Sequence, residues 1–505
     1  MTMSEHILKC GDLEFKDGKI TAKVVLDRIR DVDPFNNGIY NRHDELSLGH
    51  MFSDVFRHVA RYNTTAKEWF VFDGKVWKRD EGSMTVEQYA KMFQRALMVY
   101  STEITNDRSL DEVSEYQKYI AKLGARGKRV TMLQDARDFN FVSNDAFDRD
   151  PFLLNCQNCV INLRTMERLE HDPNLMLSKI SNVWFDPDAE SGEFLKFLSE
   201  IMLGDKDKMS YLQRLFGYVM IGENTQEACY LCYGSTTRNG KSTLLEIIGY
   251  MLGDYAMNIQ PETLAQKDKN SRNASGDIAR LDGCRFLHCS EPPKKMRFDV
   301  ALLKTLIGRD KITARHMYER EFEFVPVFKL VINTNHLPLV ADDTLFSSER
   351  IKVITFDRHF EPEEQDRTLK RRLKSRDNIS GIFNWCLEGL RLFEEAGEVL
   401  TEPESVKEAT RDYRRASDKV QRYIDDCLNP AIGVNVSVKE AYIYYGMWCR
   451  DNGYGVENKG NFLEELKTKG LFAPSGTVDG RTVHNVITNH MFNPDILNTF
   501  NSVYE

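Results

Sequence analysis

The sequence predicts an α/β fold of several domains, organised around a nucleotide-binding sheet near the middle of the chain. An apolar stretch at 230–233 runs through a small, polar turn into an amphipathic helix that extends to residue 252. That order is typical of a phosphate-binding loop. Farther along, the apolar stretches 286–289 and 328–332 each lead into polar residues. At 505 residues the chain is also too long for one hydrophobic core.

The first 225 residues predict a mixture of helices and short strands. The expected helices cover 46–62, 86–100, 110–123, 194–203 and 206–221. Asp73-Gly74 stands between two aromatic stretches and predicts a β-hairpin. Three short strands are expected within 152–185. A break rich in Asp, Pro and Gly at 185–194 then indicates a domain boundary.

The phosphate-binding loop is predicted at 234–243, GSTTRNGKST. Backbone N–H groups of the turn and of the helix N-terminus would point at the β-phosphate. Lys241 would reach the β- and γ-phosphates, and the Ser242 hydroxyl could take a Mg²⁺ position. The usual spacing puts a glycine six residues before the lysine, where Ser235 stands. The candidate nucleotide-binding residues are Gly234, Asn239, Gly240, Lys241, Ser242 and Thr243.

An acidic residue is expected at the end of the next strand. Residues 285–293, RFLHCSEPP, place Glu291 there, 50 residues after Lys241. A carboxylate at this point could polarise the attacking water or hold Mg²⁺. The alternative is a strand that simply ends in a solvated glutamate.

A polar sensor of the γ-phosphate is expected on a third strand. The stretch FKLVINTNHLPL, 328–339, offers Asn333 and Asn335. Strand alternation sends both to the same face, so they compete for the role. We favour Asn335 because it lies nearer the carboxyl end of the strand, where ligands of open α/β sheets gather. A structural amide that closes the His-Leu-Pro turn is the alternative.

Two further features concern charge. Arg350 precedes another strand, and an arginine supplied by a neighbouring subunit can neutralise transition-state charge in ring ATPases. Between Glu291 and the asparagine strand lies a stretch of mixed charge that is mildly basic. Its cations are Lys304, Arg309, Lys311, Arg315, Arg320 and Lys329. A hairpin tip with His316, Tyr318 and Arg320 could bind phosphates and stack on bases, or could be an ordinary solvated hairpin.

The end of the chain and the overall composition narrow the possibilities. Residues 401–428 predict one long charged helix or two, followed by helix, helix and two short strands, an order that fits a winged-helix unit. The formal charge is −9, so any DNA contact must come from local basic patches. No membrane span or signal core is found, which predicts a soluble, intracellular protein. Two C-x-x-C pairs, Cys156/Cys159 and Cys229/Cys232, leave a zinc site as the alternative to buried free thiols.

Taken together, these motifs resemble the superfamily 3 helicases. More closely they resemble the phage- and plasmid-encoded replication proteins related to the poxvirus primase–helicase. The stretches that carry the likeness are YGSTTRNGKST, ARLDGCRFLHCSEPP, LKTLIGRDKITARHMYER, KLVINTNHLP and ERIKVITF. SGIFNWCLEGL, DYRRASDKVQRYIDDC and FLLNCQNCVINLRT add to it. The likeness covers about residues 150–505.

The resemblance implies an AAA+-like P-loop ATPase that binds ATP and Mg²⁺ and forms a ring, usually a hexamer, around single-stranded DNA. Lys241 and Ser242 would fall on the triphosphate and Mg²⁺ positions, Glu291 on the acidic motif and Asn335 on the sensor. Lys311 and Arg315 match the segment that lines the DNA channel, and the hairpin residues follow them. Arg350 corresponds to the finger region, although Glu349 stands where a second arginine is common.

We therefore expect four segments. They are an α+β accessory domain at 1–150, a helical collar at 151–225, a motor at 226–400 and a helical or winged-helix domain at 401–505. The expected function is an ATP-dependent replicative DNA helicase of a phage, plasmid or other mobile element, acting on single-stranded or forked DNA in the host cytoplasm. The alternatives are an ATP-binding replication initiator or loader, and a fused primase–helicase. A primase, a polymerase or a single-strand-binding protein are the candidate partners.

Overall fold

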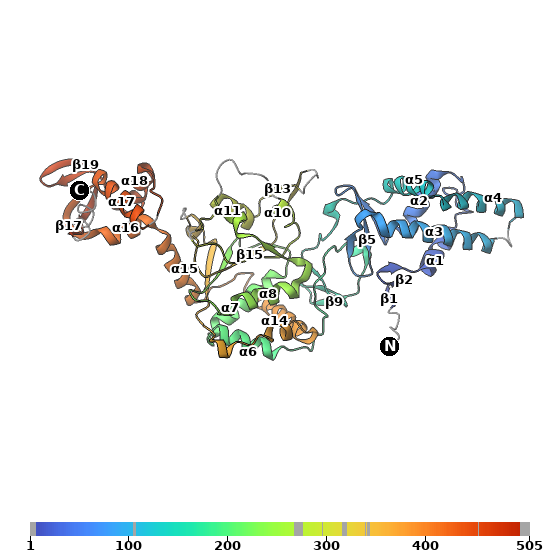
Figure 1. Cartoon of the computed structure of the whole chain (residues 1–505), viewed down its shortest axis with the longest axis horizontal. Helices are drawn as coiled ribbons and strands as arrows, with labels where there is room; N and C mark the ends of the chain where they lie inside the picture. Colours follow the sequence, from blue (N-terminus) through green and yellow to red (C-terminus); the bar gives the residue numbers. More distant parts are fainter. Residues whose placement is uncertain are drawn as a thin grey trace.

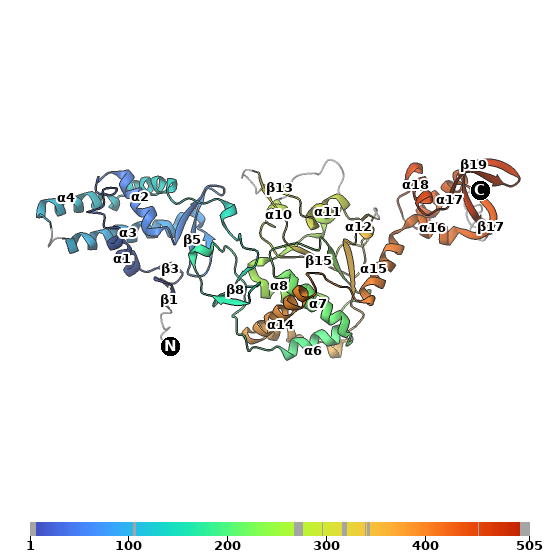
Figure 2. The same ribbon diagram turned by 180° about the vertical axis from the view of Figure 1, so that it is seen from behind.

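The protein is described here by a computed structural model, which covers residues 7–104, 108–266, 276–294, 296–315, 321–338, 340, 344–452 and 454–494. Three bodies follow one another along the long axis: an N-terminal body, a central body and a smaller C-terminal body (Figures 1 and 2). Each body has a hydrophobic core of its own. None of the described helices is long and apolar enough to cross a membrane.

The N-terminal body combines helices with two small antiparallel sheets, β1–β2–β3 and β4–β5–β6. Its strands are β1 (Ile7–Cys10), β2 (Leu13–Lys16), β3 (Lys19–Ile20), β4 (Ala60–Asn63), β5 (Glu68–Phe72) and β6 (Trp77–Arg79). Its helices are α1 (Ala22–Val32), α2 (Glu45–Phe56), α3 (Met84–Glu103), α4 (Leu110–Ala121) and α5 (Arg126–Asp135). The predicted hairpin is confirmed, because Phe72 pairs with Trp77 across Asp73-Gly74.

One predicted helix in this body is too long. The pattern at 46–62 predicts a single helix, yet α2 ends at Phe56 and β4 begins at Ala60. The last residues of the pattern form a strand because they pair with β5, with Ala60 opposite Val71. The expected helices at 86–100 and 110–123 are confirmed as α3 and α4, the latter extended by a short 3₁₀ turn.

The segment 151–221 joins the N-terminal body to the central sheet. It contains β7 (Leu153–Asn155), β8 (Val160–Asn162), β9 (Glu167–Leu169), α6 (Gly192–Ile201) and α7 (Lys206–Val219). Both expected helices are confirmed. Of the three expected strands, the one within 175–185 is wrong, since those residues run without a ladder. Side chains of this segment, such as Leu154 and Phe216, share one buried cluster with Leu244 and Phe356 of the central body.

The central body is built on a five-stranded sheet in the order β11-β12-β15-β10-β16, and every pair in it is parallel. The strands are β10 (Cys229–Tyr233), β11 (Ala256–Ile259), β12 (Phe286–Cys289), β15 (Lys329–Thr334) and β16 (Ile351–Thr355). This confirms an α/β fold with a parallel sheet. Because all five strands run the same way, their carboxyl ends meet at one edge, where ligands gather in such sheets.

Helices cover both faces of this sheet. On one face lie α6, α7, α8 (Lys241–Leu252) and α14 (Arg376–Glu395), and on the other lies α11 (Val300–Ile307) (Figure 1). Shorter helices are α9 (Pro261–Leu264), α10 (Gly276–Ala279), α12 (Thr344–Ser347) and α13 (Leu369–Leu373). Cys229 and Cys232 of β10 enter different buried clusters, so the sheet separates them, as alternation along a strand requires.

Two buried cations bind the end of α7 to the amino-terminal edge of the sheet. Arg285 donates hydrogen bonds to the carbonyl oxygens of Met220 (2.6 Å) and Leu153 (2.7 Å). Lys329 donates to the carbonyl oxygen of Ile221 (2.5 Å). Burial lowers the pKa of both groups, with no carboxylate in contact among the described residues. Their positive charge is instead offset by the carbonyls and the partial negative charge of a helix C-terminus.

The C-terminal body is linked to the sheet by α15 (Glu404–Ser417). It consists of α16 (Lys419–Cys427), β17 (Leu428–Ser437), α17 (Val438–Asp451), α18 (Lys459–Thr468), β18 (Phe472–Val478) and β19 (Arg481–Phe492). The expected order of helix, helix and two strands is confirmed, and β17 adds a third strand to the sheet β17–β19–β18. The charged segment at 401–428 forms two helices rather than one.

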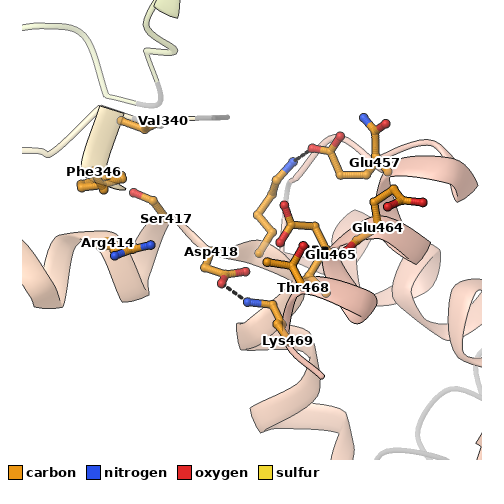
Figure 3. Close-up of a pocket in the computed structure, with 13 residues that line it drawn as sticks. Val340, Phe346, Arg414, Ser417, Asp418, Glu457, Glu464, Glu465, Thr468 and Lys469 are labelled. Atoms are coloured by element: carbon orange, nitrogen blue, oxygen red, sulfur yellow. Dashed lines mark hydrogen bonds and ion pairs between the residues drawn. The ribbon is translucent and has the colours of Figure 1, made fainter. Parts of the chain in front are cut away.

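The break between these two helices lies at Asp418. Its carboxylate accepts a hydrogen bond from the Gln421 backbone at the start of α16 (2.8 Å) and forms an ion pair with Lys469. Figure 3 shows the pair of Asp418 and Lys469, and Lys419 pairs with Glu457. On the other side of the break, Tyr413 of α15 donates to the carbonyl oxygen of Pro338 in the central body (2.5 Å). The central body thus holds α15 at Tyr413, and the C-terminal body holds Asp418 and Lys419.

The contact between α7 and α14 predicts a strict requirement for glycine. A Cβ atom at Gly217 would lie 2.2 Å from the backbone nitrogen of Leu390, which cannot move without displacing α14. We expect Gly217→Ala to lower the free energy of unfolding by about 3 kcal/mol, measured by urea denaturation. Gly249→Ala in α8 is the control, because its Cβ would meet only ordinary contacts with His288 and Phe286. It should be neutral or stabilising; equal losses in the two variants would contradict this account.

Candidate functional site

The predicted phosphate-binding loop connects β10 to α8 at the carboxyl edge of the sheet, and two glycines fix its shape. Gly240 has a φ of 84°, and a Cβ there would lie 2.3 Å from the Ile201 side chain of α6. A Cβ at Gly234 would lie 2.1 Å from the amide nitrogen of Asn239. The position at which the loop leaves no room for a side chain is therefore Gly234, and the next residue, Ser235, is exposed. This explains why a serine is tolerated at the usual glycine position.

Lys241 is the buried centre of the site. Its Nζ donates to Asn239 Oδ1 (2.8 Å) and Asn335 Oδ1 (2.8 Å), with the Gly234 carbonyl oxygen at 3.5 Å. Burial lowers the pKa of Lys241 from 10.5 to about 8, against the opposing effects of Cys232 and Glu291. No carboxylate forms an ion pair with it in the described part of the chain. The lysine is held by amide oxygens, which leaves its charge uncompensated.

Asn335 connects the lysine to the predicted acidic residue. Its Oδ1 accepts from Lys241, and its Nδ2 donates to Glu291 Oε1 (3.0 Å). The three residues come from the loop, from the end of β15 and from the end of β12. The structure thus brings Lys241, Asn335 and Glu291 together in one hydrogen-bonded chain.

Asn333 faces the same edge and contacts a different residue. Its Nδ2 donates to Ser242 Oγ (2.9 Å) at the start of α8. Its Oδ1 is buried and has no hydrogen-bond partner among the described residues. A buried amide oxygen without a partner is costly in a folded protein. The two asparagines therefore divide the site, with Asn335 on the lysine and the glutamate and Asn333 on the serine.

A cavity of about 660 Å³ opens beside this edge. Its wall includes Ser242, Glu291 and Asn333, together with Glu246 and Lys374 farther from the loop. Glu246 of α8 forms ion pairs with Lys370 and with Lys374 (2.6 Å). The predicted Mg²⁺-binding residues, Ser242 and Glu291, thus line a shared space. The remaining loop residue of the predicted set, Thr243, lies on the first turn of α8 and is half-buried.

Arg350 lies at the opposite edge of the sheet, where the amino-terminal ends of the strands meet. It precedes β16, and its carbonyl oxygen accepts from the Cys229 nitrogen at the start of β10 (2.8 Å). Its side chain forms an ion pair with Glu227 (2.7 Å), and Arg309 approaches the other oxygen of that carboxylate (3.5 Å). The structure does not bring Arg350 to Lys241. The length of one strand, about 16 Å, separates the two edges.

Of the predicted DNA-binding hairpin, the structure describes the base. β13 (Ile312–Ala314) pairs with β14 (Phe322–Phe324) in antiparallel register. Lys311 forms an ion pair with Glu323 (3.6 Å), and Arg315 is exposed. His316, Tyr318 and Arg320 lie outside the described residues. Lys329, counted with the cations of this stretch, is the first residue of β15 and is fully buried, so it cannot contact DNA.

Several residues that shape the site carry no signal in the local sequence. His359 Nδ1 lies 2.8 Å from the Thr237 carbonyl oxygen, and the Phe360 nitrogen donates to the Arg238 carbonyl oxygen (2.9 Å). The segment after β16 thus braces the outer side of the loop. Ile201 and Glu227 act through tertiary contacts in the same way. Only a prediction of which segments of the chain are neighbours in space could have identified them.

Comparisons with known proteins find two family models and several viral relatives. A family model described as "D5 N terminal like" matches residues 49–203, and a "Family of unknown function (DUF5906)" matches 232–350. The likeness thus begins about 100 residues earlier than the 150–505 expected from the motifs.

Curated relatives are about one-quarter identical to this chain over the parts that align. "Putative helicase L207/L206" of Acanthamoeba polyphaga mimivirus is 27% identical over 341 residues, 63% of this chain and 35% of that protein. "Putative helicase 022R" of Frog virus 3 is 24% identical over 49% of this chain and 27% of that protein. "Putative helicase V13" of Sputnik virophage is 26% identical over 41% and 28%. The chain spans about a quarter to a third of the length of these relatives.

Solved structures offer a weaker likeness. The apo structure of the NrS-1 C-terminal region covers 85% of this chain and 95% of that chain, at 12% identity and a TM-score of 0.46. The assignment of the fold therefore rests on the strand order of the central sheet itself.

The buried lysine predicts a pH-dependent stability. Between pH 8 and 10.5 the unfolded lysine keeps a proton that the folded one has lost, so the protein gains stability as pH rises through this window. Below pH 8 the full cost of the buried charge remains. Without nucleotide, Lys241→Met should raise the free energy of unfolding by about 2 kcal/mol at pH 7, and the difference should shrink towards pH 10.

Urea denaturation at pH 7, 8, 9 and 10 measures this difference. Lys352→Met is the matched control, since Lys352 is also largely buried but forms an ion pair with Glu402. That variant should lose stability at pH 7, because it leaves a carboxylate without its partner. A Lys241→Met effect that is constant across the pH range would contradict the assignment of the shift to Lys241.

Proposed function

This chain belongs to the D5-like family of superfamily 3 helicases, and from that premise we propose that it is a replicative DNA helicase driven by ATP hydrolysis. One observation carries the proposal: Lys241, Asn335 and Glu291 form a continuous hydrogen-bonded chain at the carboxyl edge of a parallel sheet. A cation for the phosphates, an amide that senses them and a carboxylate for the attacking water are the groups that this chemistry needs. The curated relatives are named as helicases, which supports the same assignment.

ATP and Mg²⁺ fit the residues present at this edge. Lys241 is buried without a carboxylate partner in the described residues, so a triphosphate would supply the missing negative charge. Ser242 and Glu291 would hold Mg²⁺, which when bound neutralises charge on the phosphates. The unpartnered Oδ1 of Asn333 beside Ser242 is a further acceptor for that ion or for its water. A buried cation and a buried acceptor that lack protein partners are suited to a ligand that compensates both.

The hydrogen-bonded chain suggests how phosphate binding prepares the carboxylate. In the structure, Lys241 donates to Asn335, and Asn335 donates to Glu291. A phosphate that attracts Lys241 removes the donor from Asn335 Oδ1. The amide is then able to turn towards the phosphate and the water, and Glu291 becomes available to accept the proton of that water. Asn335 would thereby link occupancy of the loop to the state of Glu291.

The ring and the DNA path belong to the same proposal. We assign an AAA+-like P-loop fold to the central body and a winged-helix fold to the C-terminal body, and infer a hexameric ring. Because Arg350 lies at the far edge of the sheet, its side chain is too short to reach the loop of its own subunit, so it would act on a neighbour. Lys311 and Arg315, with His316, Tyr318 and Arg320, would line the channel for single-stranded DNA.

Replacing Glu291 with glutamine tests the catalytic assignment. Glu291→Gln should lower the ATPase rate by a factor of about 10² to 10⁴ because it removes the proton acceptor, while ATP binding is retained. Unwinding of a forked duplex should be lost. Glu246→Gln is the matched control, since Glu246 lines the same cavity but pairs with lysines away from the loop. Lys241→Ala should abolish both ATP hydrolysis and unwinding. Full unwinding by Glu291→Gln would refute the mechanism.

One observation favours a second candidate function. Arg350 is engaged by Glu227, so its charge is already neutralised within its own subunit. An initiator or loader that uses ATP only to hold a ring together needs no rapid turnover. In that case the wild-type protein should assemble on DNA with ATP but separate no strands, and Glu291→Gln should assemble equally well.

A further inference from the structure

Three arginines gather on the N-terminal body, far from the nucleotide site. Arg28 comes from α1, Arg57 follows the last residue of α2, and Arg61 lies in β4. His58 stands among them, and we refer to the three arginines as the basic cluster. Arg57 and Arg61 are joined by a hydrogen bond, and Arg28 lines the same hollow as His58.

Two members of the basic cluster are held in place while their outer nitrogens are left without partners. Arg57 Nε lies 2.9 Å from His58 Nε2, and Arg61 Nε donates to the Arg57 carbonyl oxygen (2.9 Å). The terminal NH₂ groups of these two arginines, and the whole guanidinium of Arg28, form no hydrogen bond or ion pair with any residue that the structure describes. A guanidinium fixed at Nε presents its outer fork, which matches two oxygens of a phosphate.

The charge of the cluster is unfavourable in the free protein. Burial lowers the pKa of Arg28 and Arg61, and the neighbouring Arg57 lowers both further. Burial and the three arginines lower the pKa of His58 to about 4, so this ring is neutral near pH 7 and accepts the Arg57 Nε–H. The carboxylates that act on the group are Asp12 and Asp31 near Arg28, and Asp172 near His58. None of them forms an ion pair with the cluster among the described residues.

We propose that the basic cluster binds the phosphate backbone of a nucleic-acid strand, as a second contact separate from the hairpin of the central body. An assembly of cations that is kept without internal partners is typical of an anion site, because the ligand supplies the compensation. The cluster lies on the N-terminal body, whereas β13 and β14 belong to the central body (Figure 1). One strand that touches both would be held at two points along its length.

The surroundings favour a strand over a free nucleotide. Arg28 and His58 line a hollow of about 530 Å³ that is also lined by Asp12, Glu170 and Asp172. Three carboxylates would repel a triphosphate that entered the hollow. Arg57 is exposed and does not line it, so a phosphate can reach the outer forks from the rim. A backbone that passes over the rim meets the arginines and avoids the acids.

The test is binding of the full-length protein, without nucleotide, to fluorescein-labelled single-stranded oligothymidylate across a salt series. Arg57→Gln/Arg61→Gln should weaken binding about tenfold at 0.1 M salt. It should also reduce the slope of log K against log salt by about 1.4, since each single-strand phosphate contact contributes about 0.7. Arg95→Gln/Arg126→Gln is the matched control. It removes the same charge from exposed arginines of the same body and should keep affinity and slope.

Two further readouts make the outcome decisive. The Arg57→Gln/Arg61→Gln variant should unfold at or above the wild-type temperature, because repulsion is relieved; a lower value would mark the arginines as structural and overturn the proposal. Equal affinity and slope in both double variants would also overturn it. A third result would also overturn it: the Arg57→Gln/Arg61→Gln variant keeps its affinity for DNA but is no longer stabilised against heat by pyrophosphate. That result would indicate a site for free phosphate. Since no ATP is present, failure of the ATPase assignment would leave this result unaffected.

Discussion

A single buried cation, Lys241, sets the constraint to which the rest of the central body conforms. Removing an ammonium group from water is costly unless polar atoms replace the water. Here the replacements are amide and carbonyl oxygens that come from the loop and from the end of β15. These atoms can surround one point only if strands of the same direction end side by side, which a parallel sheet provides. The site therefore depends on the topology of the sheet as much as on the loop.

The loop can close around the lysine only because it lacks side chains at two positions. Gly234 and Gly240 each stand where a methyl group would collide with a neighbour, one within the loop and one in α6. The second collision explains why the segment 151–221 cannot be considered apart from the sheet. Ile201 forms part of the wall behind the loop, and helices α6 and α7 share a buried cluster with α8. The site is thus formed by residues from well before the β10 strand.

Residues that belong to local motifs could be predicted from the sequence alone. Gly240, Lys241 and Ser242 are recognisable because strand, turn and helix follow one another, and Glu291 and Asn335 because each follows an apolar strand. Contacts between distant segments leave no such pattern, so the pairing of Arg350 with Glu227 and the brace from His359 could not be predicted. The same limit explains two errors: β4 has the periodicity of a helix but pairs with β5, and Lys329 looks like a surface cation but is buried at the start of β15.

The carbonyl contacts of Arg285 and Lys329 have a mechanical consequence. They tie the end of α7 and the start of β7 to two neighbouring strands from below, while Gly217 holds α7 against α14 from the side. Segment 151–221 and the sheet must then travel as one block. Trp77 donates hydrogen bonds to the carbonyl oxygens of Pro173 and Leu177, so the N-terminal body is joined to the same block. Rearrangement is left to the break at Asp418, which lies between α15, tied to the central body by Tyr413, and α16. A displacement of the sheet would reach the C-terminal body through this joint.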